Sequence, residues 1–141
     1  MTEAPRLDRF VRAQAGVYAT ALAELHAGRK QTHWMWFIFP QILGLGKSAN
    51  ARAFAIVGKD EARAYLGHEL LGGRLLECTQ AVTALAGERT PLEIFGPIDA
   101  MKFHSSMTLF EASAPDPAPF AKALDALCKG ERDAATLEKL G

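Results

Sequence analysis

The sequence has few of the features that mark secreted, membrane-spanning or metal-binding proteins. It contains only two cysteines in 141 residues, which is too few for a Cys-rich metal site and is typical of a reducing compartment. Its longest strongly apolar stretch, residues 34–39, is far shorter than the roughly 20 residues that cross a bilayer. Residues 1–8 carry acids and a proline where a secretory signal needs basic residues before an apolar run. A cytoplasmic protein with no membrane segment is therefore expected.

An excess of charge is also missing. The 16 Lys and Arg residues balance the 16 Asp and Glu residues, so general binding to nucleic acid or to an anionic membrane is not expected. The two signs are unevenly placed, because residues 1–59 carry a net charge of +5 and residues 60–141 a net charge of −5. This asymmetry has two interpretations. Either the halves pack together with complementary fields, or the first half holds an anion site.

Sustained period-two alternation, internal repeats and long linkers are absent from the sequence as well. With 49% apolar residues, the chain can bury a core of its own, so residues 1–141 are expected to form a single helical domain. No His-x-x-x-His or Glu-x-x-His pair occurs, and neither a metal nor a cofactor is expected. The predicted fold is all-α, a bundle of about six to eight helices, with residues 34–39 as a candidate for one short strand.

The expected helices follow from apolar spacing and from capping residues. Ser48 and Asp60 stand where N-caps belong, and Thr90, Pro91 and Glu93 form a capping-box pattern. The segment from 98 to 113 is apolar on most sides and is predicted to run through the middle of the fold. The predicted helical ranges are 7–27, 49–56, 61–68, 70–86, one turn after Thr90, 98–113, 118–128 and a short helix after Asp133.

The first candidate for function is the aromatic segment that follows Arg29 and Lys30. Both tryptophans and two of the eight phenylalanines lie together there. One interpretation is that these rings fill the core. The other is that some of them stack on a flat ligand while a nearby cation meets its charge. The candidate ligand-binding residues of this segment are His33, Trp34, Trp36, Phe39 and Gln41.

The second candidate is the glycine turn that runs from Gly44 through Gly46 to Lys47 and Ser48. It ends like a phosphate-binding loop, but Gln41 stands where the first glycine of that loop belongs, so a nucleotide triphosphatase is not expected. Backbone N–H groups and Lys47 could still hold one phosphate or carboxylate. The alternative is an ordinary glycine turn with a serine N-cap.

The third candidate is a polar stripe on the apolar segment 98–113. Asp99, Lys102 and Ser106 are spaced three and four residues apart, so they share one face of a helix, and Ser105 lies beside them. One interpretation is an Asp99–Lys102 ion pair at the start of the helix. The other makes these three residues the catalytic candidates, with Asp99 as a general acid or base in a ligand pocket and Ser105 as a further ligand contact.

Long and distinctive strings in the sequence carry a family resemblance. The chain resembles a family of small bacterial and fungal proteins of unknown function, some of which carry the automatic label "calpastatin". The resemblance implies a compact, mainly helical fold and no established activity. A calpastatin would be a disordered protease inhibitor, which the 49% apolar content and regular helix patterns contradict. The strings are HWMWFIFPQ at 33–41, GLG at 44–46, IFG at 94–96 and SSMTLF at 105–110, with shorter matches at 9–18 and 65–72.

Two functional hypotheses follow. In the first, the aromatic segment, the glycine turn and the polar stripe enclose a pocket for a small anionic ligand, derived from a nucleotide or similar to ADP-ribose. Its enzymatic version hydrolyses a glycosidic bond with Asp99 as the base, but the sequence does not decide whether the protein is an enzyme. The second hypothesis is a non-catalytic protein-interaction domain. In either case a monomer or a weak homodimer is expected.

Overall fold

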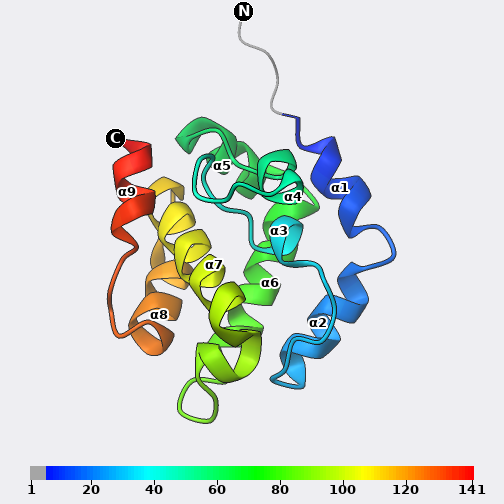
Figure 1. Cartoon of the computed structure of the whole chain (residues 1–141), viewed down its shortest axis with the longest axis vertical. Coiled ribbons are helices and arrows are strands. Elements are labelled where there is room, and N and C mark those ends of the chain that lie inside the picture. Colours follow the sequence, from blue (N-terminus) through cyan, green and yellow to red (C-terminus); the bar gives the residue numbers. More distant parts are fainter. Residues whose placement is uncertain (1–5) are drawn as a thin grey trace, which may run out of the picture.

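The structure, a computed structural model, describes residues 6–141. Residues 1–5 belong to the N-terminal segment 1–8, from which no secretory signal is expected, and they lie outside the described residues. The described residues form nine helices and no strand, so the all-α prediction is confirmed (Figure 1). The helices are α1 (Asp8–Gln14), α2 (Tyr18–His26), α3 (Met35–Ile38), α4 (Ala49–Ala53), α5 (Lys59–Gly67), α6 (Leu71–Thr83), α7 (Pro91–Ser113), α8 (Ala118–Leu127) and α9 (Ala134–Leu140).

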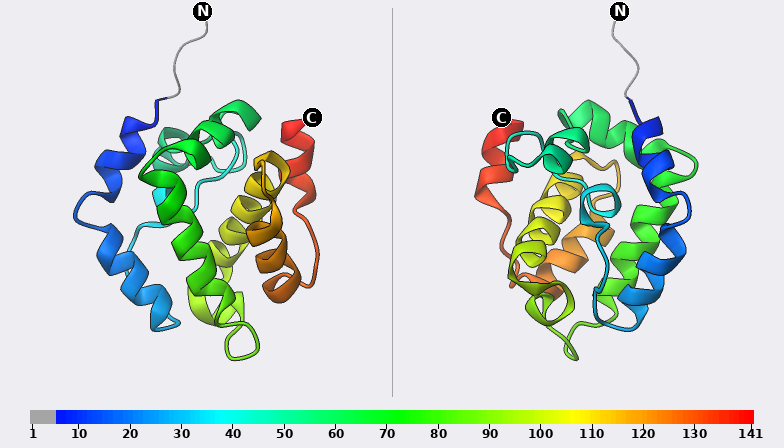
Figure 2. Two further views of the ribbon diagram at one scale, coloured as in Figure 1. Left: turned by 180° about the vertical axis from the view of Figure 1, so that it is seen from behind. Right: turned by 45° about the vertical axis from the view of Figure 1, so that its right-hand side comes forward.

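The two longest helices, α6 and α7, lie between the others. Figure 2 shows α1 and α2 along one side of the molecule and α8 and α9 along the opposite side. Helix α7 packs against α5, α8 and α9, while α6 packs against α2, α5 and α8. Their facing apolar side chains form the core, which includes Leu75, Val82, Phe103 and Phe110. None of the helices in residues 6–141 is long and apolar enough to span a membrane.

The prediction of one helix over residues 7–27 is wrong. The chain breaks after Gln14, where Ala15 is extended and Gly16 adopts a φ of 75°, and the helix resumes at Tyr18. The positive φ ends a helix, and glycine adopts it without the strain that a Cβ would add. Apolar spacing alone missed this break because apolar residues continue at helical spacing on both sides of it.

The candidate strand at 34–39 does not form. Residues Met35–Ile38 form the short helix α3, and the nearest feature to a strand in the described part of the chain is a single parallel bridge between Ile42 and Ile56. A continuous apolar run of six residues is consistent with either a buried strand or a buried helical turn. Here the run contributes its rings to the core as one helical turn.

Several helix starts follow the predicted caps. The Ser48 hydroxyl accepts from the Ala51 N–H at 3.1 Å, and Thr90 and Glu93 form the complete capping box at the start of α7. Asp133 caps α9. Helix α5 differs, because it begins at Lys59 with Gly58 as its N-cap and Asp60 inside its first turn.

Helix α7 is kinked, and the two predicted helical pieces meet at the kink. Gly96 has a φ of 80° and a ψ of 169°, and Pro97 follows it. The second piece runs through the core as predicted, except at its start, where Ile98 and Met101 are 69% and 72% exposed. Further along the same face, Ser105 and Thr108 are covered by Asp133. Among residues 6–141, no such cover reaches Ile98 and Met101.

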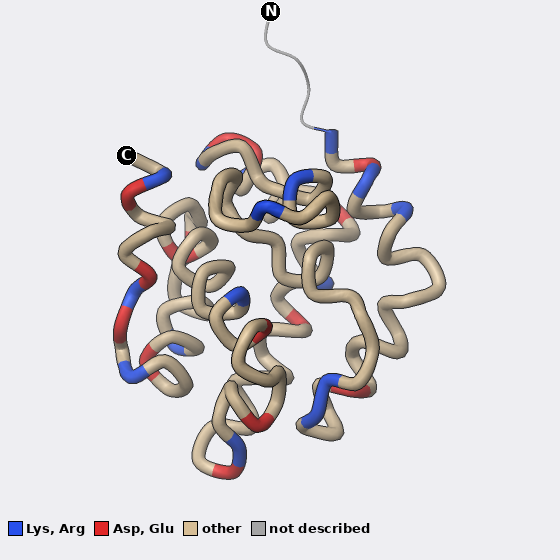
Figure 3. Tube along the Cα trace, in the orientation of Figure 1, with Lys and Arg blue, Asp and Glu red and all other residues tan. Residues whose placement is uncertain are grey.

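Partly buried ion pairs join the two halves of opposite charge. Arg9 pairs with Glu61 at 3.1 Å, and Lys30 pairs with Asp99 at 2.9 Å. Figure 3 shows basic residues gathered on α1 and on the segment through α4. Complementary packing of the halves therefore accounts for part of the charge asymmetry.

Candidate functional site

The aromatic segment divides its rings between the core and a pocket. Trp34 and Phe39 are fully buried, and Phe39 packs edge-on against Phe103, with ring centroids 5.2 Å apart, and against Phe95 at 6.0 Å. For these two candidates the core interpretation is correct. Trp36 is only partly buried and lines a pocket. It is the tryptophan that a ligand can reach.

A glutamate on α2 holds the segment in place. The Glu24 carboxylate accepts hydrogen bonds from the Gln31 N–H at 2.7 Å, from the Thr32 N–H and hydroxyl at 3.0 and 2.6 Å, and from the Trp34 indole at 2.9 Å. Desolvation raises the pKa of Glu24, but these hydrogen bonds outweigh it and lower the pKa to about 2. The sequence does not reveal this role, because the partners of Glu24 come from a separate loop.

Asp99 sits between two lysines. Its Oδ2 lies 2.9 Å from the Lys30 ammonium and its Oδ1 lies 3.5 Å from the Lys102 ammonium. The side chains of Lys30, Asp99 and Lys102 are 8%, 20% and 22% exposed. The predicted Asp99–Lys102 pair therefore forms, and Lys30 joins it from the aromatic segment. We call these three residues the Lys–Asp–Lys cluster.

Each lysine of the cluster also lies over an indole ring. The Lys30 ammonium is 5.1 Å from the ring centroid of Trp34, and the Lys102 ammonium is 4.9 Å from that of Trp36. The aromatic segment and the polar stripe of α7 thus face each other. The first hypothesis requires the aromatic segment and the polar stripe to lie side by side, and the contact between Trp36 and Lys102 meets this requirement.

An open pocket of about 330 Å³ lies beside the cluster, at the kink of α7. Most of its wall is apolar, with few polar groups, a composition typical of small-molecule sites. Lys102 does not line this pocket but contacts two residues that do, Trp36 and Asp99. The lining residues are Lys30, His33, Met35, Trp36, Phe95, Gly96, Pro97, Ile98 and Asp99.

Three polar groups at the pocket differ in how many hydrogen-bond or ion-pair partners the protein gives them. His33 is exposed and makes no hydrogen bond or ion pair with residues 6–141. The indole N–H of Trp36 is buried without a partner among the described residues. Asp99, by contrast, has both carboxylate oxygens engaged by ammonium groups. His33 is therefore the lining side chain most available to hydrogen-bond a ligand.

Two predicted serines lie away from this pocket. The Ser105 hydroxyl donates to Asp133 at 2.9 Å and so fastens the start of α9 to α7. Ser106 is fully buried, its hydroxyl has no partner among the described residues, and it is not part of the pocket lining. Of the three catalytic candidates, Asp99 lines the pocket, Lys102 contacts two of the lining residues, and Ser106 lies away from the pocket.

The structure does not bring the glycine turn to the pocket. Gly44 lies against the Lys139 side chain of α9, Gly46 against Ala51, and Ser48 caps α4. The serine-capped turn is therefore the interpretation that the contacts favour, with Lys47 exposed beside it. The backbone carbonyl of Gln41 accepts a hydrogen bond from the Ile56 N–H at 2.8 Å. Gln41 therefore takes part in the short β-bridge between Ile42 and Ile56.

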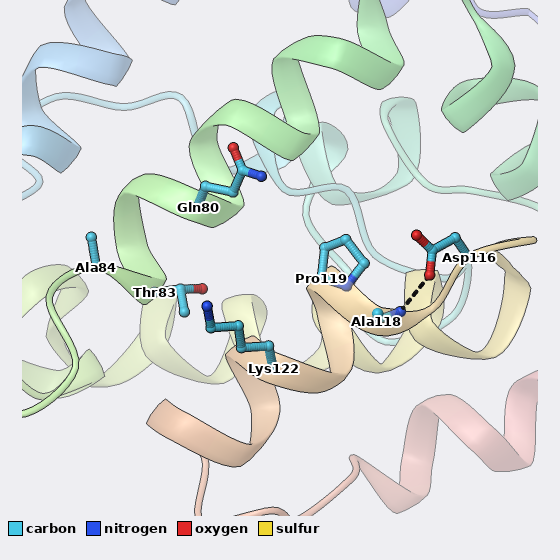
Figure 4. Close-up of a pocket in the computed structure, with 7 residues that line it drawn as sticks. All are labelled: Gln80, Thr83, Ala84, Asp116, Ala118, Pro119 and Lys122. Carbon is cyan, nitrogen blue, oxygen red and sulfur yellow. Dashed lines mark hydrogen bonds between the residues drawn. The ribbon is translucent and has the colours of Figure 1, made fainter.

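A second cavity of about 410 Å³ lies between α6 and α8 (Figure 4). In Figure 4 the Lys122 side chain extends from α8 toward Thr83 of α6. The Asp116 carboxylate accepts a hydrogen bond from the Ala118 N–H, the first residue of α8, at 3.1 Å. The lining, which comprises Gln80, Thr83, Ala84, Asp116, Ala118, Pro119 and Lys122, includes no aromatic side chain. The pocket at the α7 kink is the better candidate site.

Residues 6–141 contain no group of three His, Cys, Asp or Glu side chains placed to bind a metal ion. The site at the α7 kink thus consists of an indole, a histidine and the Lys–Asp–Lys cluster. These groups can bind a ring and a negative charge.

The family model for "Protein of unknown function (DUF1810)" matches residues 4–140. The chain belongs to this family. A crystal structure of the conserved hypothetical protein Rv1873 from Mycobacterium tuberculosis superimposes with a TM-score of 0.94, at 48% sequence identity and over 96% of each chain. No curated protein matches the DUF1810 chain. The predicted membership of an uncharacterised helical family is therefore confirmed.

Proposed function

We propose that this DUF1810 protein binds a small organic anion that carries a flat ring, in the pocket at the α7 kink. One observation carries the proposal: the Lys102 ammonium lies 4.9 Å from the Trp36 ring and 3.5 Å from Asp99, and both of these residues line the pocket. A stacking surface and an excess of positive charge therefore meet at one opening. This combination suits a ligand with a ring and a negative group.

The charges of the cluster support an anion rather than a cation. Two ammonium groups share one carboxylate, so the cluster carries a net charge of +1. Lys30 also donates to the Thr32 carbonyl at 2.6 Å, whereas Asp99 is the only hydrogen-bonding or charged partner of Lys102 among the described residues. An ammonium has three donors, so Lys102 retains unused hydrogen-bonding capacity. His33, free of partners among the described residues, adds a second group that can meet an anion.

The contacts of Asp99 favour binding over catalysis. A general base must reach the proton that it takes, and each Asp99 oxygen already has one of its lone pairs directed at an ammonium group. Hydrolysis of a glycosidic bond thus stays a prediction from the sequence. We propose a binding protein that acts as a monomer or a weak homodimer, and sedimentation velocity would measure its oligomeric state.

A thermal-shift screen tests this proposal. Nucleotides, sugar phosphates and aromatic carboxylates would be added to the full chain. A ligand at a hundred times its Kd adds about 2.7 kcal/mol, which raises the Tm by several degrees. The Lys102→Met variant should lose this rise while its own Tm changes little, because partly exposed ion pairs contribute about 0–1 kcal/mol. Lys59→Met, at an exposed lysine on α5, serves as the control and should respond like the wild type.

A non-catalytic protein-interaction domain is the alternative, and one observation favours it. Leu92, Ile98 and Met101, three large apolar residues around the kink of α7, are 59%, 69% and 72% exposed. Under this alternative no compound in the screen raises the Tm, and the Lys102→Met variant behaves like the wild type. Either result would contradict the small-anion proposal.

A further inference from the structure

We infer that the ligand of this pocket is an aromatic monoanion with an apolar body, such as a carboxylate on a fused ring, rather than a sugar phosphate or a nucleotide. The inference rests on the proposed function and narrows its ligand class. It follows from the polar groups of the lining, the charge of the cluster, the apolar surface at the opening and the size of the pocket.

The lining offers few hydrogen-bonding partners for sugar hydroxyls. In the described part of the chain, the charged or titratable side chains that line it are Lys30, His33 and Asp99. Lys30 already pairs with Asp99 and donates to Thr32, and Asp99 accepts from two lysines. A site built to bind hydroxyl groups must supply a partner for each of them, since a buried polar group without a partner is costly. Among the lining side chains only His33 and the buried Trp36 N–H have no partner in the described residues, which is too few to satisfy a ribose.

The charge at the pocket matches one negative charge better than two. The Lys–Asp–Lys cluster has a net charge of +1. Because Asp99 is part of the pocket lining, the carboxylate of the cluster also lies next to the space for the ligand. A phosphate dianion would lie close to this carboxylate and be repelled by it. A monocarboxylate would neutralise the excess charge of the cluster and meet less repulsion.

Apolar residues continue from the pocket onto the surface. Ile98 lines the pocket and is 69% exposed, and Met101, one turn further along the same face of α7, is 72% exposed. Exposed apolar side chains in contact with a pocket favour a ligand whose body is apolar. We call Ile98 and Met101 the apolar rim.

The size of the pocket limits the ligand. Its volume of about 330 Å³ is at the lower end of the roughly 300–1,000 Å³ found for ligand pockets. A ligand with one fused ring and one charged group fits within such a space. A dinucleotide-sized ligand such as ADP-ribose would leave most of its polar groups outside it.

Four matched compounds test the inference by isothermal titration calorimetry: 2-naphthoate, its neutral analogue 2-naphthamide, the phosphate ester 2-naphthyl phosphate, and AMP. We expect 2-naphthoate to bind at least about tenfold more tightly than each of the other three, a difference of about 1.4 kcal/mol. If AMP or 2-naphthyl phosphate binds more tightly than 2-naphthoate, the inference is overturned and the proposed function stands. If none of the four binds, and no compound raises the Tm in the wider screen, both fail.

Two variants separate the roles of the rim and of the charge. Ile98→Asp should weaken 2-naphthoate at least about tenfold through lost apolar contact and added like charge. Its control is Leu43→Asp, at a leucine that is 47% exposed and lies outside the pocket. This variant should bind 2-naphthoate as tightly as the wild type does. Asp99→Asn should improve 2-naphthyl phosphate relative to 2-naphthoate by about tenfold, because the repelling charge is gone. An unchanged preference in Asp99→Asn, or equal binding by Ile98→Asp and the wild type, would refute the inference.

Discussion

Glu24 shows how much of the site depends on one side chain that lies outside the pocket. Its carboxylate receives four hydrogen bonds from three residues of the aromatic segment. Lys30 and His33 belong to the same loop. Because the loop has little regular structure of its own, Glu24 determines where these residues stand relative to α7.

Replacement of Glu24 by Gln should destabilise the protein by about 1–3 kcal/mol at pH 6, since a charged acceptor of several hydrogen bonds is lost. The pKa of Glu24 falls from 4.5 to about 2 on folding, so its contribution is complete above pH 4.5 and is lost as the pH falls toward 2. Urea unfolding should thus show a smaller difference between wild type and variant at pH 3 than at pH 6. The matched control is Glu69→Gln, at an exposed glutamate; equal effects of the two substitutions would contradict this role.

The two cysteines should be poorly reactive in the folded protein. Burial raises the pKa of Cys78 to about 12 and that of Cys128 to about 11, so little thiolate exists near neutral pH. At pH 7.5, iodoacetamide should modify both residues much more slowly than it modifies free cysteine, with Cys128 ahead of the buried Cys78. Mass spectrometry with and without urea measures this. Rapid native labelling of Cys78 would show that α6 opens readily.

At the scale of the helical elements, glycines decide where helices break and how closely they approach. Gly16 and Gly96 adopt positive φ values and separate α1 from α2 and the two pieces of α7. The sequence predicted the second break because Pro97 follows Gly96. It did not predict the first, because Gly16 stands inside a continuous apolar pattern.

Gly72 and Gly73 provide a matched pair within α6. A Cβ at Gly72 would collide with the backbone carbonyl of Leu66, whereas a Cβ at Gly73 would meet no atom within 4 Å. We expect Gly72→Ala to destabilise the protein by at least about 2 kcal/mol, because the turn between α5 and α6 must shift. Gly73→Ala should stabilise it by about 0.5–1 kcal/mol through helix propensity. Denaturant unfolding compares them, and similar values for the two variants would rule out a close approach of α6 to the end of α5.

At the scale of the whole molecule, the aromatic core joins elements that are far apart in the sequence. Phe39 contacts Trp34 within its own segment and Phe95 and Phe103 on both pieces of α7. It therefore links the loop that carries Lys30 to the helix that carries Asp99.

Truncation of Phe39 to Ala should reduce the free energy of unfolding by about 3–5 kcal/mol, because a fully buried ring is replaced by a cavity. Leu43→Ala, at a half-exposed leucine four residues away, should change it by less than about 1 kcal/mol. Thermal or urea unfolding followed by far-ultraviolet circular dichroism would measure both. A small effect of Phe39→Ala would mean that the core refills the space and that this ring does not hold the site together.

The helical class, most helix ends and the family resemblance were all predictable from the sequence, because they depend on neighbouring residues. Ser48, Thr90 and Asp133 cap the helices that follow them. Apolar spacing locates the buried faces of α6 and α8. The sequence also put Asp99 with Lys102, since residues three apart share a helix face.

The site itself was decided by the tertiary structure. Three interactions form only after loops and helices from different parts of the chain pack together. They are the Lys30–Asp99 ion pair, the hydrogen bond from the Trp34 indole to Glu24, and the cation–π contact of Lys102 with Trp36. The same packing buries Trp34 and Phe39, leaves Ile98 and Met101 exposed, and keeps the glycine turn away from the pocket. Periodicity specifies which face of a helix is apolar, but which neighbour covers that face depends on contacts between segments far apart in the sequence.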